Sequence, residues 1–218
     1  MTNQANAMRL VDEVHDDLDR EMGASDQVVK TLVRRQMNQG GNIIMAGLEP
    51  LTEAEFFTGG ANGISPAWTM GHLACVLDLF TSWIEGRDLE IARWTHDIFN
   101  SLNIEKKKDR TKAESVDPKV LPKGDIMLLF RQSQVHALEV LRDFDVKLWE
   151  RPTPANVPDT LPTWGCIWQS LGVHPFWHLG ELAGCIPRFH GTYTLNTVTH
   201  YFYTSADQRS GVVAKEGT

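Results

Sequence analysis

Apolar residues recur at helical spacing in four long stretches of this chain. Side chains three and four positions apart lie on one side of an α-helix, so each stretch predicts a helix with an apolar face. Polar and charged residues fill the intervening positions. The four predicted helices cover residues 25–47, 65–86, 122–144 and 163–185.

Residues at the ends of these stretches support the predicted boundaries. Ser25 and Thr163 are suited to the N-cap position, where a side-chain oxygen accepts a hydrogen bond from the first turn. Pro66 is suited to a first helical turn, and Gly86 is suited to ending the second helix. Pro175 lies inside the fourth predicted helix, where a proline removes a backbone donor, so a local kink is expected there.

The remaining stretches predict less regular structure. Residues 8–22 place apolar side chains at helical spacing among acidic ones, which predicts a short amphipathic arm. Residues 87–122 form a long charged connection with a short helix expected at 91–102, a length that permits a crossover between helices that are not neighbours. Prolines mark 151–162 as an extended loop, and the composition of 192–218 favours an extended, loosely ordered tail.

These patterns contain no clear strand ladder, so the sequence predicts an all-α fold built as a helix bundle. A chain of 218 residues, 42% of them hydrophobic, can bury a sizeable core and is most simply one domain spanning 1–218. We place the domain core at about 25–191, with an N-terminal arm over 1–24 and a C-terminal tail over 192–218.

Charge argues against a nucleic-acid partner, and the absence of a long apolar stretch argues against a membrane partner. The formal net charge is −7 and the only dense basic run is Lys106, Lys107 and Lys108, whereas phosphate binding requires a concentrated basic surface. No stretch approaches the roughly 20 apolar residues that span a bilayer. The first residues are polar and lack the apolar segment of a signal peptide, so a cytoplasmic location is expected.

Three histidines on apolar stripes are the main candidates for chemistry. His174 and His178 are four residues apart and project from one face of the fourth helix, and His72 lies on the apolar stripe of the second. Three imidazoles suit a divalent metal, with zinc or nickel favoured over iron. Three protein ligands leave one coordination position open, as catalytic zinc sites do.

Two further residues are candidates for roles beside this site. His136 lies on the expected inner face of the third helix and is interpreted as a fourth ligand, a base near the open position or a core histidine. Glu181 follows His178 by three residues, so it could orient that ligand or move a proton. Hydrogen bonding at the helix surface is the structural alternative for Glu181.

Aromatic residues and cysteines accompany the histidines in sequence. The aromatics are interpreted as core packing, with lining of an apolar substrate pocket as the alternative. The three cysteines form no paired framework and are interpreted as small core residues rather than nucleophiles. These residues are Trp68, Trp83, Trp164, Trp168, Phe176 and Trp177, and Cys75, Cys166 and Cys185.

The order of four motifs resembles the DinB-like superfamily. The motifs are GLEPLTEAEF after the first helix, SPAWTMGHLA in the second, WERPTP after the third and GVHPFWHLGELAGCIPRFHG in the fourth. The resemblance covers roughly residues 25–191. It implies a four-helix bundle of up-up-down-down order with a long crossover, and a divalent metal held by three histidines that match His72, His174 and His178.

Characterised proteins that resemble this pattern include thiol-dependent S-transferases and the metal-binding domain of ergothioneine-type sulfoxide synthases. The resemblance therefore implies a metal-dependent thiol S-transferase or hydrolase that acts on a small molecule, with a low-molecular-weight thiol as one candidate. The mechanism would be Lewis-acid activation of a water or a thiolate. The alternative is a non-catalytic metal-binding or small-ligand-binding bundle, for example a stress-associated one. A third possibility is a purely structural bundle whose histidines bind no metal. Homodimerisation is a further expectation from the family and the amphipathic arm.

Overall fold

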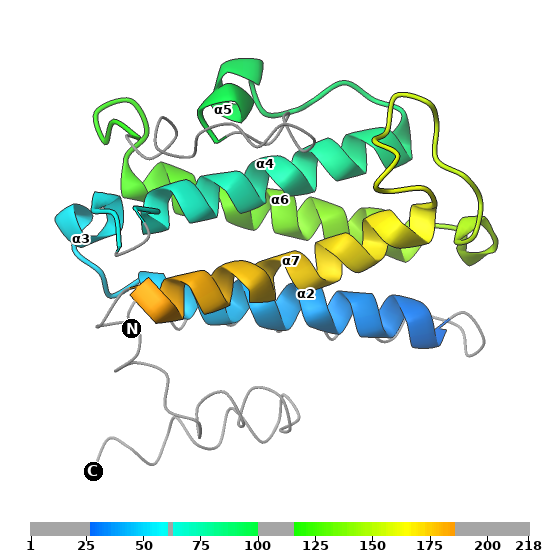
Figure 1. The fold of residues 1–218 in the computed structure, drawn as a ribbon, viewed down its shortest axis with the longest axis horizontal. Coiled ribbons are helices and arrows are strands. Elements are labelled where there is room, and N and C mark those ends of the chain that lie inside the picture. The colour runs from blue at the N-terminus through cyan, green and yellow to red at the C-terminus, as the bar shows by residue number, and fades with distance from the viewer. Residues whose placement is uncertain (1–26, 61–62, 100–115, 186–218) are drawn as a thin grey trace, which may run out of the picture.

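The protein is all-helical over the residues that its computed structural model describes, which are 27–60, 63–99 and 116–185. Pro152 and Thr163 form an isolated β-bridge, and no strand occurs in these ranges. The predicted all-α class is therefore confirmed. Four long helices lie side by side (Figure 1): α2 (Gln27–Leu48), α4 (Pro66–Glu85), α6 (Lys123–Asp143) and α7 (Trp164–Cys185).

The directions of the four helices differ from the predicted order. The chain runs one way along α2 and α7 and the opposite way along α4 and α6 (Figure 1). Lys30, near the start of α2, donates a 2.8 Å hydrogen bond to the carbonyl oxygen of Arg142 at the end of α6. Lys123, at the start of α6, donates a 2.8 Å bond to the carbonyl oxygen of Glu49, just after α2. The order is up, down, down, up, and the predicted up-up-down-down order is wrong.

The long connection between α4 and α6 permits this arrangement. The chain leaves α4 at one end of the molecule and enters α6 at the other, so the two helices run parallel (Figure 1). They also pack extensively against each other. The prediction that this connection joins helices that are not neighbours is therefore wrong, since α4 and α6 are in contact.

Local signals define the helix ends as predicted. The Ser65 side chain accepts a 3.1 Å hydrogen bond from the Trp68 backbone at the start of α4, with Pro66 as first residue. Gly86 ends that helix with φ of 65°, in the left-handed region that favours glycine. The Thr163 side chain likewise accepts a 3.3 Å bond from the backbone of Cys166 at the start of α7.

Three short helices complete the described structure. The expected short helix at 91–102 is present as α5 (Arg93–Ile98), which lies beside α4. The 3₁₀-helix η2 (Val146–Leu148) follows α6. Helix α3 (Glu53–Phe57) was not predicted, although Thr52 and Glu55 form the capping box that marks its start.

Helix α4 is the most deeply placed of the four. All of its residues from Pro66 to Ser82 are buried except His72, which is half-buried. Helices α6 and α7 pack against it, and α5 also lies against it. A polar side chain on α4 therefore needs a partner within the protein, because water does not reach most of this helix.

Pro175 does not interrupt α7, which is continuous from Trp164 to Cys185. The proline is buried against α2, where a Cβ atom added to Gly40 would lie 2.7 Å from the Pro175 Cβ. The glycine therefore allows α2 to approach α7 closely at the proline.

Several expectations fall on residues outside the described ranges. They are the arm at 8–22, Ser25, the lysine run at 106–108 and the tail at 192–218. The side chain of Cys185 is also outside the description. Within the described residues, the long helices are too short or too polar in every window to cross a membrane.

Candidate metal centre

The structure brings the three predicted histidines together. His72 comes from α4, and His174 and His178 come from successive turns of α7. One ligand atom from each residue lies within 4.8 Å of the other two. The ring centroids of His72 lie 5.2 Å from His174 and 5.1 Å from His178. Pro175, where a kink was predicted, does not separate the two α7 histidines, since their Nε2 atoms are 3.0 Å apart.

His178 is held in one orientation by Glu181. The His178 side chain is buried, and its Nδ1 atom lies 2.8 Å from Oε2 of Glu181, one turn along α7. A carboxylate only accepts, so Nδ1 carries the proton and donates it. The Nε2 atom of a neutral His178 then carries a lone pair, which is the state that binds a metal.

Glu181 also receives a second hydrogen bond. The indole Nε1–H of the exposed Trp177 donates to Glu181 Oε1 at 3.0 Å. Both carboxylate oxygens therefore have a donor from α7 itself. Of the two functional roles predicted for Glu181, this arrangement supports orientation of His178.

His72 is oriented by a backbone carbonyl that sequence reasoning did not identify. Its Nδ1 atom lies 2.9 Å from the carbonyl oxygen of Phe99, at the end of α5. A carbonyl oxygen only accepts, so His72 Nδ1–H donates and Nε2 remains as the ligand atom. Residues 72 and 99 are far apart in sequence, and no spacing rule connects them.

Gly71 permits this contact. The Phe99 ring is fully buried and packs directly on Gly71, where an added Cβ would overlap the ring atoms. The residue before His72 must therefore lack a side chain for Phe99 to reach its position. A glycine in the middle of a helix, which is unfavourable by itself, was the available sequence signal.

The contact between His174 and His178 restricts where a proton can lie on the two rings. Because His178 Nδ1 is the donor to Glu181, its Nε2 lone pair faces His174 Nε2 across 3.0 Å. Two lone pairs at this distance repel, so either a proton on His174 Nε2 or a shared cation must lie between them. The geometry is therefore suited to capturing a positive ion.

Two of the six predicted aromatics contact the site residues. Trp68 stacks on His72 with ring centroids 4.7 Å apart and planes 8° apart, and it makes a T-shaped contact with His178 at a centroid distance of 6.1 Å. Trp177 contacts Glu181 as described. The other four are core or helix-packing residues: Trp83 packs on Phe80, Trp168 on Phe144, Phe176 faces Gly40, and Trp164 packs at the core edge.

A small cavity adjoins His174 inside the bundle. Its volume is about 10 Å³, enough for about one water molecule. Its walls are mainly apolar, with His174 and the buried amide of Gln134 as polar groups. The Gln134 Nε2 atom donates a 3.1 Å hydrogen bond to the Met37 carbonyl oxygen, which fixes the amide. The cavity is lined by Met37, Leu73, Val76, Leu77, Phe130, Gln134, Leu171, His174 and Pro175.

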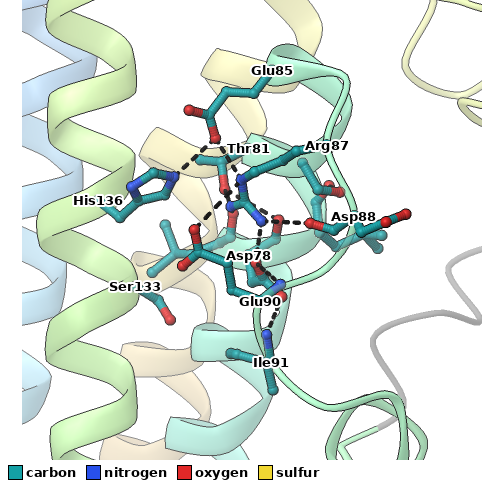
Figure 2. A network of polar contacts seen from close by, with 12 residues as sticks. Asp78, Thr81, Glu85, Arg87, Asp88, Glu90, Ile91, Ser133 and His136 are labelled. Carbon is teal, nitrogen blue, oxygen red and sulfur yellow. Dashed lines mark hydrogen bonds and ion pairs between the residues drawn. The ribbon is translucent and has the colours of Figure 1, made fainter.

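The structure does not bring His136 to this site. Its Nε2 atom lies 2.9 Å from Glu85 Oε2, and its side chain is 28% exposed (Figure 2). Glu85 follows His72 by 13 residues, about 20 Å along α4. His136 is therefore neither a fourth ligand nor a base at the open position, and its partly exposed side chain is not a core histidine.

His136 instead belongs to a polar network at the far end of α4 (Figure 2). Arg87 donates to Glu85 at 2.7 Å and to Asp78 at 3.0 Å. Burial alone raises the pKa of Glu85, but the hydrogen bonds and positive charges of Arg87 and His136 outweigh it and lower that pKa. The network joins α4 and α6 to the connection that follows α4.

Asp78 is the buried centre of this network. It accepts hydrogen bonds from His96 at 3.0 Å, from the Ile91 backbone at 3.0 Å and from the Glu90 backbone at 3.2 Å. Burial alone raises the pKa of Asp78, but these bonds and the one from Arg87 lower it below its ordinary value. Since the bonds reach both the α4 to α5 connection and α5, Asp78 holds this segment against α4.

The two described cysteine side chains lie outside the histidine cluster. Cys75 is fully buried, and Cys166 is half-buried and accepts a hydrogen bond from the Thr163 hydroxyl at 3.3 Å. Neither joins a group of candidate metal ligands within the described residues. Their positions agree with the interpretation as small helix-packing residues.

Comparison of the chain with protein-family models, with curated proteins and with solved structures finds no match. The functional argument therefore depends on the site itself.

Proposed function

We propose that this protein binds a divalent metal ion through His72, His174 and His178. The observation that carries the proposal is the convergence of three ligand atoms from two helices to within 4.8 Å. Two of the imidazoles already have their Nδ1 atoms engaged, by Phe99 and by Glu181. Such outer contacts are characteristic of histidines that bind a metal through Nε2.

The residues fit a divalent ion of the zinc or nickel type. Three neutral imidazoles are the nitrogen donors that these metals prefer, with iron as a further candidate. Nitrogen ligands of a tetrahedral zinc lie roughly 3.3 Å apart, given zinc–nitrogen distances of about 2.0–2.1 Å. The 3.0 Å separation of the α7 nitrogens is close to this value, and the ligand atom of His72 lies within 4.8 Å of those of both α7 histidines.

We further propose that the chain is a DinB-like four-helix bundle and a metal-dependent enzyme of thiol S-transferase or hydrolase type. The four motifs and the three-histidine cluster support this assignment. A divalent ion at such a site supplies Lewis-acid chemistry and lowers the pKa of the molecule in its open position. The substrate class we propose is a small molecule, with low-molecular-weight thiols as the first candidates.

The chain's own residues have defined tasks in this proposal. Glu181 and the Phe99 carbonyl keep Nε2 of His178 and His72 unprotonated and directed inward. Trp68 covers one face of His72 and excludes water from it. The apolar cavity beside His174 has room for one water-sized group. These features favour binding of a small ligand under partly desolvated conditions.

The small size of that cavity also favours a second candidate function. The cavity beside His174 holds about one water molecule, so it is not itself a pocket for an organic substrate. The alternative is therefore a non-catalytic bundle that binds a metal or a small ligand. Turnover of thiol and electrophile pairs by metal-loaded protein separates the two functions.

Elemental analysis tests the metal proposal. The untagged protein, purified without chelator, is compared with His72→Ala, His174→Ala and His178→Ala, and circular dichroism monitors their helicity. We expect about one metal ion per chain in the wild type and loss of stoichiometric metal in each variant with helicity retained. Absence of metal after reconstitution with zinc and nickel would reject the proposal, and metal retained by the His174 variant would reject this ligand set.

A further inference from the structure

The Trp68 indole carries a buried hydrogen-bond donor beside the three histidines. The residue is 3% exposed, and its Nε1–H has no hydrogen-bond partner in the described structure. Buried donors in native proteins almost always have an acceptor. An exception next to a binding site indicates that a bound molecule supplies the acceptor.

The position of Trp68 connects this donor to the metal centre. Its ring lies flat on His72, with centroids 4.7 Å apart, and makes a T-shaped contact with His178. The indole is rigid and held by stacking, so its donor is fixed before any ligand arrives. A fixed donor in a site that excludes water binds an anionic oxygen strongly.

Trp168 provides an internal comparison. Its Nε1–H is also buried and without a partner in the described structure, and its ring packs on Phe144. It precedes His174, the nearer of the two α7 histidines, by six residues, about 9 Å along α7. Trp68 and Trp168 therefore carry the same unpaired group, and of the two rings the Trp68 ring is the one that packs on His72 and His178.

We propose that the Trp68 indole N–H binds a carboxylate oxygen of the small molecule that occupies the three-histidine site. The inference rests on the proposed metal function and narrows its ligand class. The favoured ligand coordinates the metal through one atom and presents a carboxylate oxygen to Trp68. A positively charged metal centre bound only by neutral imidazoles adds attraction for such an anion.

The test uses the full zinc-loaded chain with two thiols that differ in a carboxylate, mercaptoacetate and ethanethiol. Wild type, Trp68→Phe and Trp168→Phe are titrated by calorimetry after their zinc contents have been measured. Phenylalanine keeps an aromatic ring and removes the N–H. We expect Trp68→Phe to weaken mercaptoacetate binding about ten-fold and to change ethanethiol binding less than about two-fold. Trp168→Phe should change the affinity for either thiol less than about two-fold.

The indole resonance of Trp68 in a ¹⁵N-labelled wild-type protein gives a second readout. We expect it to move downfield with mercaptoacetate and to stay in place with ethanethiol. An unmoved resonance, an unchanged mercaptoacetate affinity in Trp68→Phe, or equal weakening of both thiols would overturn the inference. If Trp68→Phe loses zinc, its affinities are not interpretable, and the shift of the Trp68 resonance in the wild type decides whether the indole N–H binds the carboxylate. A wild type that binds no zinc rejects the metal proposal and this inference together, whereas a zinc-loaded wild type with an unmoved resonance rejects this inference alone.

Discussion

The Nδ1–H of His72 donates a 2.9 Å hydrogen bond to the carbonyl oxygen of Phe99. This bond joins the middle of α4 to the end of α5, so the connection after α4 takes part in the candidate metal centre. The bond fixes the tautomer of His72 and depends on how closely the Phe99 ring approaches α4. Gly71 determines that approach.

Replacement of Gly71 by alanine should weaken both folding and metal binding. The added methyl group overlaps the Phe99 ring, so the ring and its carbonyl must move away from His72. We expect a loss of about 1–3 kcal/mol in the free energy of unfolding, as for overpacked cores. Metal affinity should fall about 10- to 100-fold, as for loss of other outer-shell contacts. Urea unfolding and competition with a chromogenic chelator measure the two effects.

Gly124→Ala is the control for this substitution. Gly124 lies in the first turn of α6, and an added Cβ would meet no atom within 4 Å. We expect unchanged metal affinity and an unfolding free energy within about 1 kcal/mol of the wild type. Equal metal affinity in both glycine variants would contradict the role assigned to Phe99.

Glu181→Gln tests the orientation of His178. Glu181 accepts from His178 Nδ1–H and from Trp177 Nε1–H through its two oxygens, whereas a glutamine has only one acceptor oxygen. One of the donors therefore loses its acceptor. We expect metal affinity to fall about 10- to 100-fold with helicity unchanged. The chelator competition assay measures the affinity.

Trp177→Phe is the matched variant for Glu181. It removes the second donor and leaves the bond between Glu181 and His178 intact. Trp177 is 67% exposed, so the substitution should not disturb the core. We expect metal affinity within about two-fold of the wild type, because the contact with the ligating histidine is kept. A loss as large as that of Glu181→Gln would show that Trp177, too, positions the site.

Sequence patterns predicted the long helices and the three histidines because both depend on local spacing. Apolar periodicity placed the four helices within a few residues, and caps such as Ser65 and Gly86 fixed their ends. The four-residue spacing of His174 and His178 already implied a shared face. These features depend on relations within one helix.

Helix directions and outer contacts could not be predicted because they depend on relations between distant segments. The long connection after α4 allows either direction for α6, and its length alone does not decide between them. The bond from His72 to Phe99 arises only once α5 packs on Gly71. His136 was misassigned for a related reason: its helical stripe indicated a face of α6, but not that Glu85 lies opposite it.

Asp78→Asn should destabilise the protein at neutral pH and lose this effect in acid. The pKa of Asp78 is lowered in the folded protein, so its charged form contributes stability above its ordinary pKa of 3.8. That contribution disappears as the pH falls through the lower pKa of the folded state. Removal of the buried Asp78 charge should lower the free energy of unfolding by about 3 kcal/mol at pH 7. Urea unfolding from pH 7 to pH 3 should show the difference from wild type shrinking below about pH 4.

His136→Ala tests whether this histidine takes any part in metal binding. Its partner is Glu85, and both side chains are partly exposed, so loss of this pair should cost only about 0.2–1 kcal/mol of unfolding free energy. Because the pair lies about 20 Å along α4 from His72, metal content and affinity should match those of the wild type. Elemental analysis and chelator competition of the variant beside His178→Ala measure this directly. A His136 variant depleted of metal to the level of His178→Ala would require the site to include α6, contrary to the arrangement of the described residues.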